Sequence, residues 1–250
     1  MNPTTETVKT RLGLEKSKPQ LNLLGFDIYI RRSVLFAAAA GVAFFREIGL
    51  IVAVALVISV LVHELGHSLA FRRYGSDSHI VVHIFGGYSL PHTPENLSHR
   101  AWVIIATAGP LAAFLLLGLP GLALWFFDPF GWNGVGFGAL AANVLIWFNV
   151  IWGLANLAPV WPLDGGRILY HSTGGNWHVT RTATVAVSAI GAAVAWQFGF
   201  IFVAFFLGFN ALQIWNARNP QLGAGTNGQG TTAGRPHHAR QAYYLSLIHI

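Results

Sequence analysis

The chain has 250 residues, of which 54% are hydrophobic and only 10% are charged, and its mean hydropathy is +0.52. Soluble domains carry about 25% charged residues, so this composition excludes an ordinary soluble protein. The absence of cysteine excludes disulfides and thiolate metal sites. The formal net charge of +6 does not indicate nucleic-acid binding, because the basic residues are scattered beside apolar segments.

Six apolar segments indicate membrane-spanning helices, so we expect an all-α polytopic membrane protein. In chain order, they cover about residues 33–45, 48–71, 101–127, 135–157, 182–197 and 198–215. The first is short for the roughly 20 residues that a spanning helix needs. The boundary between the fifth and the sixth segment is the least defined.

A small β-structure is expected between the second and third segments, near the cytoplasmic face. Apolar and polar residues alternate from His79 to Phe85, just before Gly86 and Gly87, which is typical of a short β-hairpin. The segment Phe26–Ile30 is a candidate third strand. We therefore expect a hairpin at His79–Tyr88, paired with that segment.

Both ends of the chain are polar or rich in Gly and Thr, which predicts flexible tails at residues 1–24 and 217–250 around a core at 25–216. The first 20 residues lack the apolar stretch of a cleavable signal peptide. Residues 245–250 resemble a translated sequencing adapter, so we expect the C-terminal end to be artefactual or truncated.

The motif His63-Glu64-Leu65-Gly66-His67 closes the apolar run of the second segment. Residues four apart share one face of a helix, so His63 and His67 can present two imidazole nitrogens to one metal ion. Glu64 lies beside that ion, where a carboxylate can take a proton from metal-bound water. Although HExxH also occurs on ordinary solvated helices, ionisable groups at membrane depth are costly and usually functional.

A second motif follows the fourth apolar segment, in the break Asn156-Leu157-Ala158-Pro159-Val160-Trp161-Pro162-Leu163-Asp164-Gly165-Gly166. A catalytic zinc needs three protein ligands and one open position. Asp164 is the obvious third ligand, because it also adjoins an apolar segment with no soluble stretch nearby.

The order and spacing of these two motifs resemble those of the site-2 protease family of intramembrane zinc metalloproteases, and the similarity covers roughly residues 25–215. Two shorter matches support it: Phe85-Gly86-Gly87 is similar to the family's Gly-Gly hairpin segment, and Ala108-Gly109-Pro110 to its A-G-P helix motif. The chain departs from the family pattern at Ala113, where relatives often carry Asn, and at Trp161, where many carry Pro.

This resemblance implies that His63, His67 and Asp164 bind one zinc ion per chain, that Glu64 is the catalytic acid and base, and that Asn156 holds the substrate or polarises its carbonyl. It also implies a minimal catalytic core, since neither tail is long enough for the PDZ or CBS domains of many relatives.

The expected function is hydrolysis of transmembrane protein substrates near the cytoplasmic leaflet, as in regulated intramembrane proteolysis. The expected partners are therefore a membrane-spanning substrate and the lipid bilayer, with no nucleic acid; the oligomeric state stays open. A catalytically silent adaptor that binds transmembrane segments is the alternative, and a transporter is a third possibility. A transporter gives no reason for an HExxH motif paired with a distant Asp-Gly-Gly.

The basic residues predict the orientation in the membrane, which we expect to be the cytoplasmic membrane of a prokaryote. They gather before the first segment and in alternate connections after it: Lys9, Arg11, Lys16, Lys18, Arg31, Arg32, Arg72, Arg73, Arg100, Arg167, Arg181 and Arg218. The opposite connections hold only Arg46. By the positive-inside rule, both termini and both motifs face the cytoplasm.

Reporter fusions test this orientation. A reporter fused after Arg73 or after Arg218 is expected to score cytoplasmic, whereas one placed between Asp128 and Gly138 is expected to score external. Cytoplasmic labelling of that last connection would overturn both the number of spans and the shared depth of the two motifs.

Overall fold

The computed structural model describes residues 18–83, 86–127 and 137–217. The chain divides into two compact units, one made of Met1–Leu97 with Ile104–Asn156 and the other of Ser98–Val103 with Leu157–Ile250. Each unit has its own cluster of buried apolar side chains. In the first unit the cluster consists of Phe26, Ile28, Ile80 and Val82, and in the second of Trp161, Tyr170, Trp177 and Ile214.

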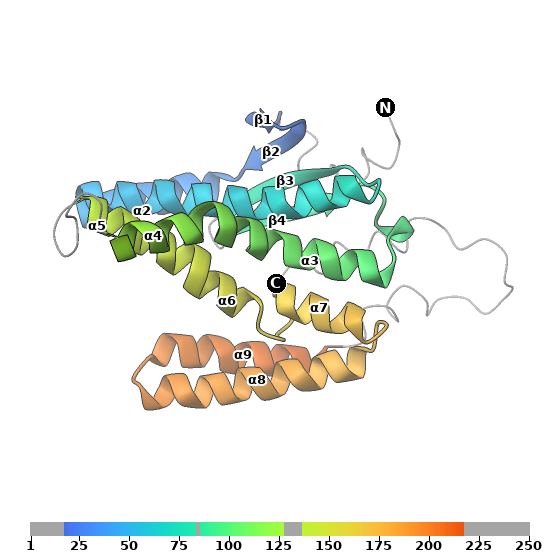
Figure 1. Cartoon of the computed structure of the whole chain (residues 1–250). Helices are drawn as coiled ribbons and strands as arrows, with labels where there is room; N and C mark the ends of the chain where they lie inside the picture. Colours follow the sequence, from blue (N-terminus) through green and yellow to red (C-terminus); the bar gives the residue numbers. More distant parts are fainter. Residues whose placement is uncertain (1–17, 84–85, 128–136, 218–250) are drawn as a thin grey trace, which may run out of the picture. The chain divides into compact units, whose positions relative to one another are not determined.

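A four-stranded sheet with the order β1-β2-β3-β4 belongs to the first unit (Figure 1). Its strands are β1 (Leu21–Leu23), β2 (Phe26–Ile30), β3 (Ser78–His83) and β4 (Gly86–Pro91). The predicted hairpin and its pairing with Phe26–Ile30 are confirmed, since β3 pairs antiparallel with β4 and parallel with β2. β1 was not predicted, and Gly86 and Gly87 are the first residues of β4. The connection at 84–85 lies outside the described residues.

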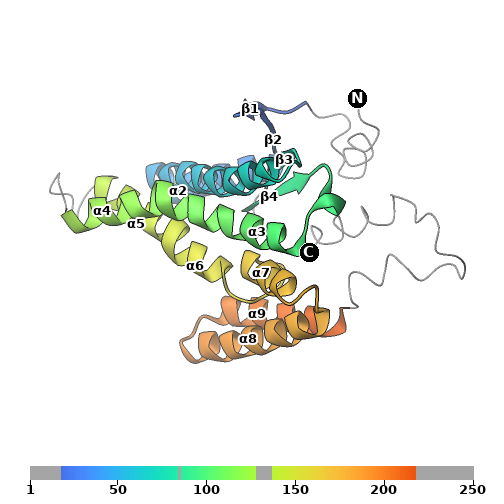
Figure 2. The same ribbon diagram turned by 45° about the vertical axis from the view of Figure 1, so that its right-hand side comes forward.

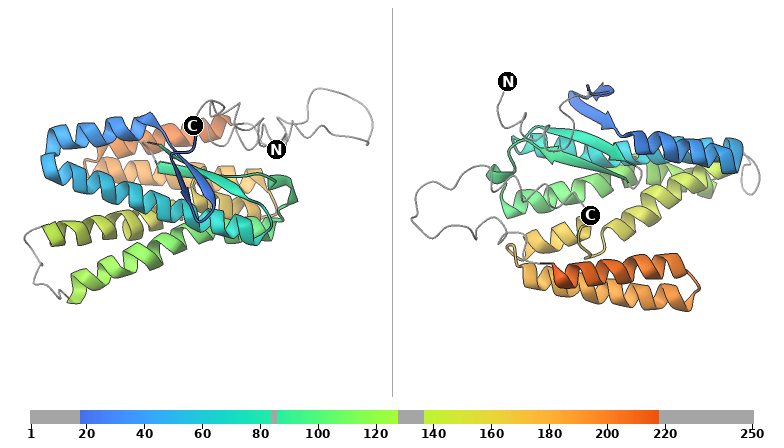
Figure 3. Two further views of the ribbon diagram at one scale, coloured as in Figure 1. Left: turned by 90° about the horizontal axis from the view of Figure 1, so that it is seen from above. Right: turned by 180° about the vertical axis from the view of Figure 1, so that it is seen from behind.

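The first two predicted segments form one element, α2 (Arg32–Arg73), which turns sharply at Arg46. Arg46 has a φ of 53° and a ψ of −130°, far from helical values. The two halves run side by side (Figure 3), and a Cβ at Gly49 would collide with the backbone of Gly41. Only the half from Ile48 to Arg73 is long enough to cross a membrane; the apolar helix Arg32–Phe44 is shorter, as the sequence predicted.

Two further spans complete the first unit. The earlier one consists of α3 (His99–Ala113), η2 (Phe114–Gly118) and α4 (Leu119–Phe127), although its first residues are grouped with the second unit. The later one consists of α5 (Phe137–Ile146), η3 (Trp147–Ile151) and α6 (Trp152–Asn156). Both η2 and η3 are π-helical insertions. Each insertion leaves its span continuous but rotates the helix after it about the span axis, relative to the helix before it.

A buried polar contact joins the later span to α2. The amide nitrogen of Asn149, in η3, donates hydrogen bonds to the Ser59 hydroxyl at 3.0 Å and to the Leu145 carbonyl at 2.9 Å. Asn149 is only 1% exposed. Ser59 lies one helical turn before His63, so this contact holds the later span against the turn that leads into the HExxH motif.

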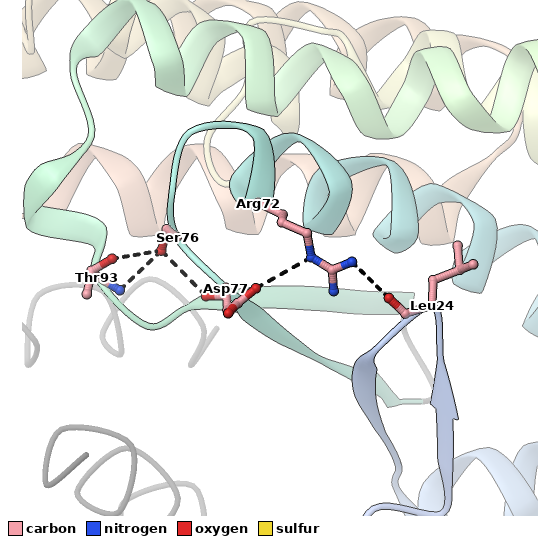
Figure 4. A network of polar contacts seen from close by, with 5 residues as sticks. All are labelled: Leu24, Arg72, Ser76, Asp77 and Thr93. Carbon is pink, nitrogen blue, oxygen red and sulfur yellow. Dashed lines mark hydrogen bonds and ion pairs between the residues drawn. The ribbon is translucent and has the colours of Figure 1, made fainter. Parts of the chain in front are cut away.

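A network of polar contacts ties the end of α2 to the sheet (Figure 4). Arg72 pairs with Asp77 at 3.5 Å and donates a hydrogen bond to the Leu24 carbonyl at 2.9 Å, in the turn between β1 and β2. The Ser76 hydroxyl accepts from the backbone N–H and the hydroxyl of Thr93, beyond the end of β4. The sheet is therefore fixed at the end of the helix that carries the HExxH motif.

The second unit contains α7 (Asp164–Ser172), α8 (Trp177–Gln197) and α9 (Ile201–Asn216). α8 and α9 run side by side and are joined by a short turn at Gly199 (Figure 2). The helix after that turn starts at Ile201, so the sixth predicted segment began three residues too early, and α8 starts at Trp177 instead of Thr182. α7 (9 residues) and η1 (Pro94–Asn96) are too short to span a membrane.

The contact between the two halves of α2 predicts an unusual response to substitution. In an ordinary helix, Gly→Ala is stabilising by roughly 0.5–1 kcal/mol. Gly49→Ala should instead destabilise the protein by about 1–3 kcal/mol, because the added methyl group forces the two halves apart. Thermal unfolding in detergent measures the effect. Gly153→Ala is the matched control, since nothing lies within 4 Å of a Cβ there. A Gly49→Ala protein as stable as that control would contradict the close packing.

Candidate metal centre

His63 and His67 lie one turn apart on the last third of α2 and present their Nε2 atoms to each other at 3.1 Å. Two imidazole nitrogens bound to one tetrahedral zinc at about 2.0–2.1 Å would lie about 3.3 Å apart. The two nitrogens therefore already stand at the separation that a shared ion requires. The predicted pairing of these histidines on one helix face is present in the structure.

The His67 ring is held in the orientation that metal binding needs. Its Nδ1 lies 2.7 Å from the carbonyl oxygen of Ile105 in α3, so Nδ1 carries the hydrogen and donates it. Nε2 is then left with a lone pair for a metal. His67 is 7% exposed. The nearby Gly109, in the Ala-Gly-Pro motif, leaves room for this ring, because a Cβ there would collide with it.

Glu64 points from α2 toward the sheet and is 4% exposed. A Cβ at Gly87 in β4 would come within 2.8 Å of the Glu64 Cγ atom, which explains why glycine is present there. The Ser89 hydroxyl, two residues along the same strand, donates to the Glu64 Oε2 atom at 2.8 Å. Sequence reasoning missed Ser89. Alternation along β4 places Gly87 and Ser89 on one face of the strand, but only the contact with Glu64 gives Ser89 a role.

His83, at the end of β3, contributes to the electrostatics around Glu64. Burial lowers the pKa of His83, the Glu64 carboxylate opposes that shift, and Arg31 adds to it. His83 therefore favours the neutral form at neutral pH, and it adds no positive charge beside the carboxylate.

Asn156 is the last residue of α6, and its Nδ2 atom lies 3.5 Å from the Nε2 of His63. Asn156 follows Asn149 by two helical turns, so the contact of Asn149 with Ser59 aligns this face of the span with the histidine face of α2. The structure thus places Asn156 beside His63.

Asp164, the predicted third ligand, begins α7 in the second unit and is 6% exposed. It follows a non-helical segment with a cis peptide between Trp161 and Pro162. The two glycines after it allow close packing, because a Cβ at Gly165 would collide with the carbonyls of Leu157 and Ala158. Asp164 is the first residue of α7, and the N-terminus of a helix is a favourable place for a carboxylate.

The other histidines form two separate pairs. His79 Nδ1 and His92 Nε2 are 3.4 Å apart and line a cavity of about 380 Å³ together with Asp27, Arg72 and Asp77. Among the described residues, neither this pair nor the next gathers a third metal donor.

The second pair belongs to the second unit. The Nδ1 atoms of His99 and His171 are 3.0 Å apart, and the His171 ring stacks on Trp102 at 5.2 Å. The pKa of His171 is lowered to about 3, mainly by burial and further by the charges of His99 and Arg167. His171 is therefore neutral at physiological pH and packs at the opposite end of α7 from Asp164.

The chain is similar in sequence to several zinc metalloproteases. The chain is 34% identical over 115 residues to the zinc metalloprotease MJ0392 of Methanocaldococcus jannaschii, covering 46% of this chain and 32% of the relative. Two further relatives are provisionally named as zinc metalloproteases, and this chain is similar to both in sequence. The protein from Synechocystis is 32% identical, in an alignment that covers 63% of this chain and 39% of the relative. Rip3 of Mycobacterium tuberculosis is 36% identical, in an alignment that covers 47% of this chain and 29% of the relative. No family model matches the chain.

Among solved structures, the site-2 protease from Methanocaldococcus jannaschii matches with a TM-score of 0.52 and 21% identity, over 85% of this chain and 97% of that chain. The chain has the site-2 protease fold and zinc metalloprotease homologues. The resemblance to this family and the predicted fold class are thus confirmed. The chain spans well under half the length of the curated relatives that it matches.

The contact between Gly109 and the His67 ring generates a prediction about metal binding. Gly109→Ala should displace the ring from its hydrogen bond to Ile105 and lower metal affinity by about tenfold or more, as losses of such supporting contacts do. Metal content after dialysis, measured by mass spectrometry, gives the result. Gly153→Ala, on another helix of the first unit, should keep full metal content. Undiminished affinity in the Gly109→Ala protein would show that the ring does not need this space.

Proposed function

We propose that this protein is an intramembrane zinc endopeptidase that hydrolyses peptide bonds of transmembrane proteins near the cytoplasmic leaflet. The observation that carries the proposal is the pair of Nε2 atoms 3.1 Å apart on an apolar span, with one ring fixed by a backbone carbonyl and a buried glutamate beside it. The names of the relatives support the choice of zinc.

In this proposal, one zinc ion is held by His63, His67 and Asp164. Two neutral imidazoles and one carboxylate suit zinc and leave a fourth position open for water or substrate. When bound, zinc supplies a Lewis acid, which lowers the pKa of water and polarises a carbonyl group.

The chain's own residues supply the proton transfers. Glu64 accepts a proton from the attacking water and later donates it to the leaving amine. The Asn156 amide, adjacent to His63, donates a hydrogen bond to the carbonyl oxygen as negative charge develops on it. Substitution of Glu64 or of Asn156 alone should therefore slow the chemical step more than it weakens substrate binding.

The substrate must present an extended backbone to these groups. A membrane-spanning helix keeps its carbonyls in internal hydrogen bonds, so it has to unwind locally before hydrolysis. β4 is an edge strand of the sheet, and its Gly87 and Ser89 adjoin Glu64. Pairing of an unwound substrate with the outer edge of β4 would satisfy the substrate's backbone and place it beside the catalytic glutamate.

The protein is an integral membrane protein, with four helices long and apolar enough to span a bilayer and two shorter apolar helices. The arrangement of basic residues supports an orientation with both termini and the HExxH end of α2 on the cytoplasmic side. The proposed partners are accordingly a membrane-spanning substrate and the bilayer.

Substitution of the acidic residues separates metal binding from catalysis. Glu64→Gln keeps the side-chain size but cannot accept a proton, so it should retain zinc and lose activity on a model transmembrane substrate by a factor of about 10²–10⁴ or more. Asp164→Ala, His63→Ala and His67→Ala should each lower zinc content as well as activity. The measurements are zinc stoichiometry and cleavage in detergent or liposomes.

Asp77→Asn serves as the control, because Asp77 is an exposed acid and its amide replacement can still accept a hydrogen bond from Arg72. It should keep both zinc and activity. Cleavage by Glu64→Gln at the wild-type rate would remove the role of Glu64. Zinc binding by Asp164→Ala with undiminished affinity would remove Asp164 from the ligand set.

A further inference from the structure

The Ser89 side chain makes a close set of contacts with Glu64. Its hydroxyl oxygen lies 2.8 Å from the Glu64 carboxylate atom Oε2 and 2.9 Å from the main-chain carbonyl oxygen of the same residue. The hydroxyl of Ser68 lies 3.0 Å from the Ser89 oxygen and donates to it. All three residues belong to the first unit, with Glu64 and Ser68 on α2 and Ser89 on β4.

The hydrogen atoms in this cluster determine the direction of each bond. A serine hydroxyl has one hydrogen and two acceptor lone pairs. Because Ser68 donates to the Ser89 oxygen, the single hydrogen of Ser89 is available for Glu64. The main-chain carbonyl oxygen of Glu64 can only accept, and the carboxylate oxygen can only accept while it is ionised. Ser89 therefore acts as a donor toward the glutamate.

Burial makes this bond stronger than its counterpart on a protein surface. Glu64 is 4% exposed and Ser68 is 0% exposed, whereas Ser89 is half-buried, so water can reach the bond only from the Ser89 side. Hydrogen bonds to charged groups are stronger than neutral ones, and they also restrict the rotation of the carboxylate. With Gly87 leaving space on the same strand face, the Glu64 side chain is held between β4 and α2.

We propose that Ser89 is a positioning residue that fixes the carboxylate of Glu64 for proton transfer, with Ser68 orienting the Ser89 hydroxyl. This inference rests on the proposed peptidase function. The sheet then has two roles, because β4 is the edge strand proposed to pair with the substrate and also carries the Ser89 hydroxyl that orients Glu64. Displacement of β4 would therefore disturb the base as well as substrate binding.

Activity measurements test the role of the hydroxyl. Ser89→Ala should lower kcat on a model transmembrane substrate by about tenfold to a hundredfold, the range expected for loss of one hydrogen bond to a charged group. KM and zinc content should stay within about twofold of wild type. Ser89→Thr keeps a hydroxyl and should recover most of the rate. Ser68→Ala should give a smaller loss than Ser89→Ala.

Ser78→Ala is the matched control, because Ser78 is a buried serine on the neighbouring strand whose hydroxyl has no hydrogen-bond partner among the described residues. Its kcat should equal that of wild type. An unchanged kcat in Ser89→Ala, or a loss in Ser89→Thr as large as in Ser89→Ala, would overturn the proposal.

A double-mutant cycle in the zinc-free protein tests the contact independently of catalysis. Ser89→Ala and Glu64→Ala should each lower the thermal unfolding midpoint by about 2–4 °C, and the double variant by clearly less than the sum. The pair Ser78→Ala and Glu64→Ala should be additive. Additivity in the first cycle would overturn the contact. If the two substitutions are not additive but the wild-type protein cleaves no substrate, the contact stands and only the proposed peptidase function is contradicted.

Discussion

The polar groups on one face of α2 need partners inside an apolar surrounding, and the rest of the first unit is arranged to supply them. Ser59, His63 and His67 follow one another at single helical turns along that face. The later span provides Asn149 for Ser59 and Asn156 for His63, and α3 provides the Ile105 carbonyl for His67. Because unpaired polar groups are costly in a bilayer, these contacts fix which helices can lie against α2.

Glycines give the neighbouring backbones access to this face. Gly109 on α3 leaves space for the His67 ring, and Gly87 on β4 leaves space for Glu64. Gly66, inside the HExxH motif itself, packs against the backbone of Ala108. Gly87 and Gly109 thus have a steric explanation, because a side chain at either position would displace Glu64 or His67.

Much of the fold could be predicted because its signals are local. Apolar runs located the spans, and alternation located β3. The motif HELGH placed His63 and His67 on one helix face, where the structure has them. Which strand β3 would pair with is a question of tertiary structure, yet the apolar segment Phe26–Ile30 was a sufficient guide.

The remaining features depend on contacts between distant residues or on backbone details that no pattern reports. The turn at Arg46 combines two predicted segments into α2, and the π-helical insertions η2 and η3 leave hydropathy unchanged. The short strand β1 has too few residues for a detectable alternation. Ser89 was missed because serine is common on strands, and only its position opposite Glu64 gives it a role.

The contact between Asn149 and Ser59 has a consequence for how the chain is inserted during synthesis. A span that carries a buried asparagine partitions into lipid less readily than an all-apolar one, unless a partner accepts its hydrogen bonds. Ser59 leaves the ribosome well before Asn149, so its helix can already be in the membrane when the later span arrives. The span containing Asn149 is then stabilised by docking on α2, which makes its insertion dependent on a helix synthesised earlier.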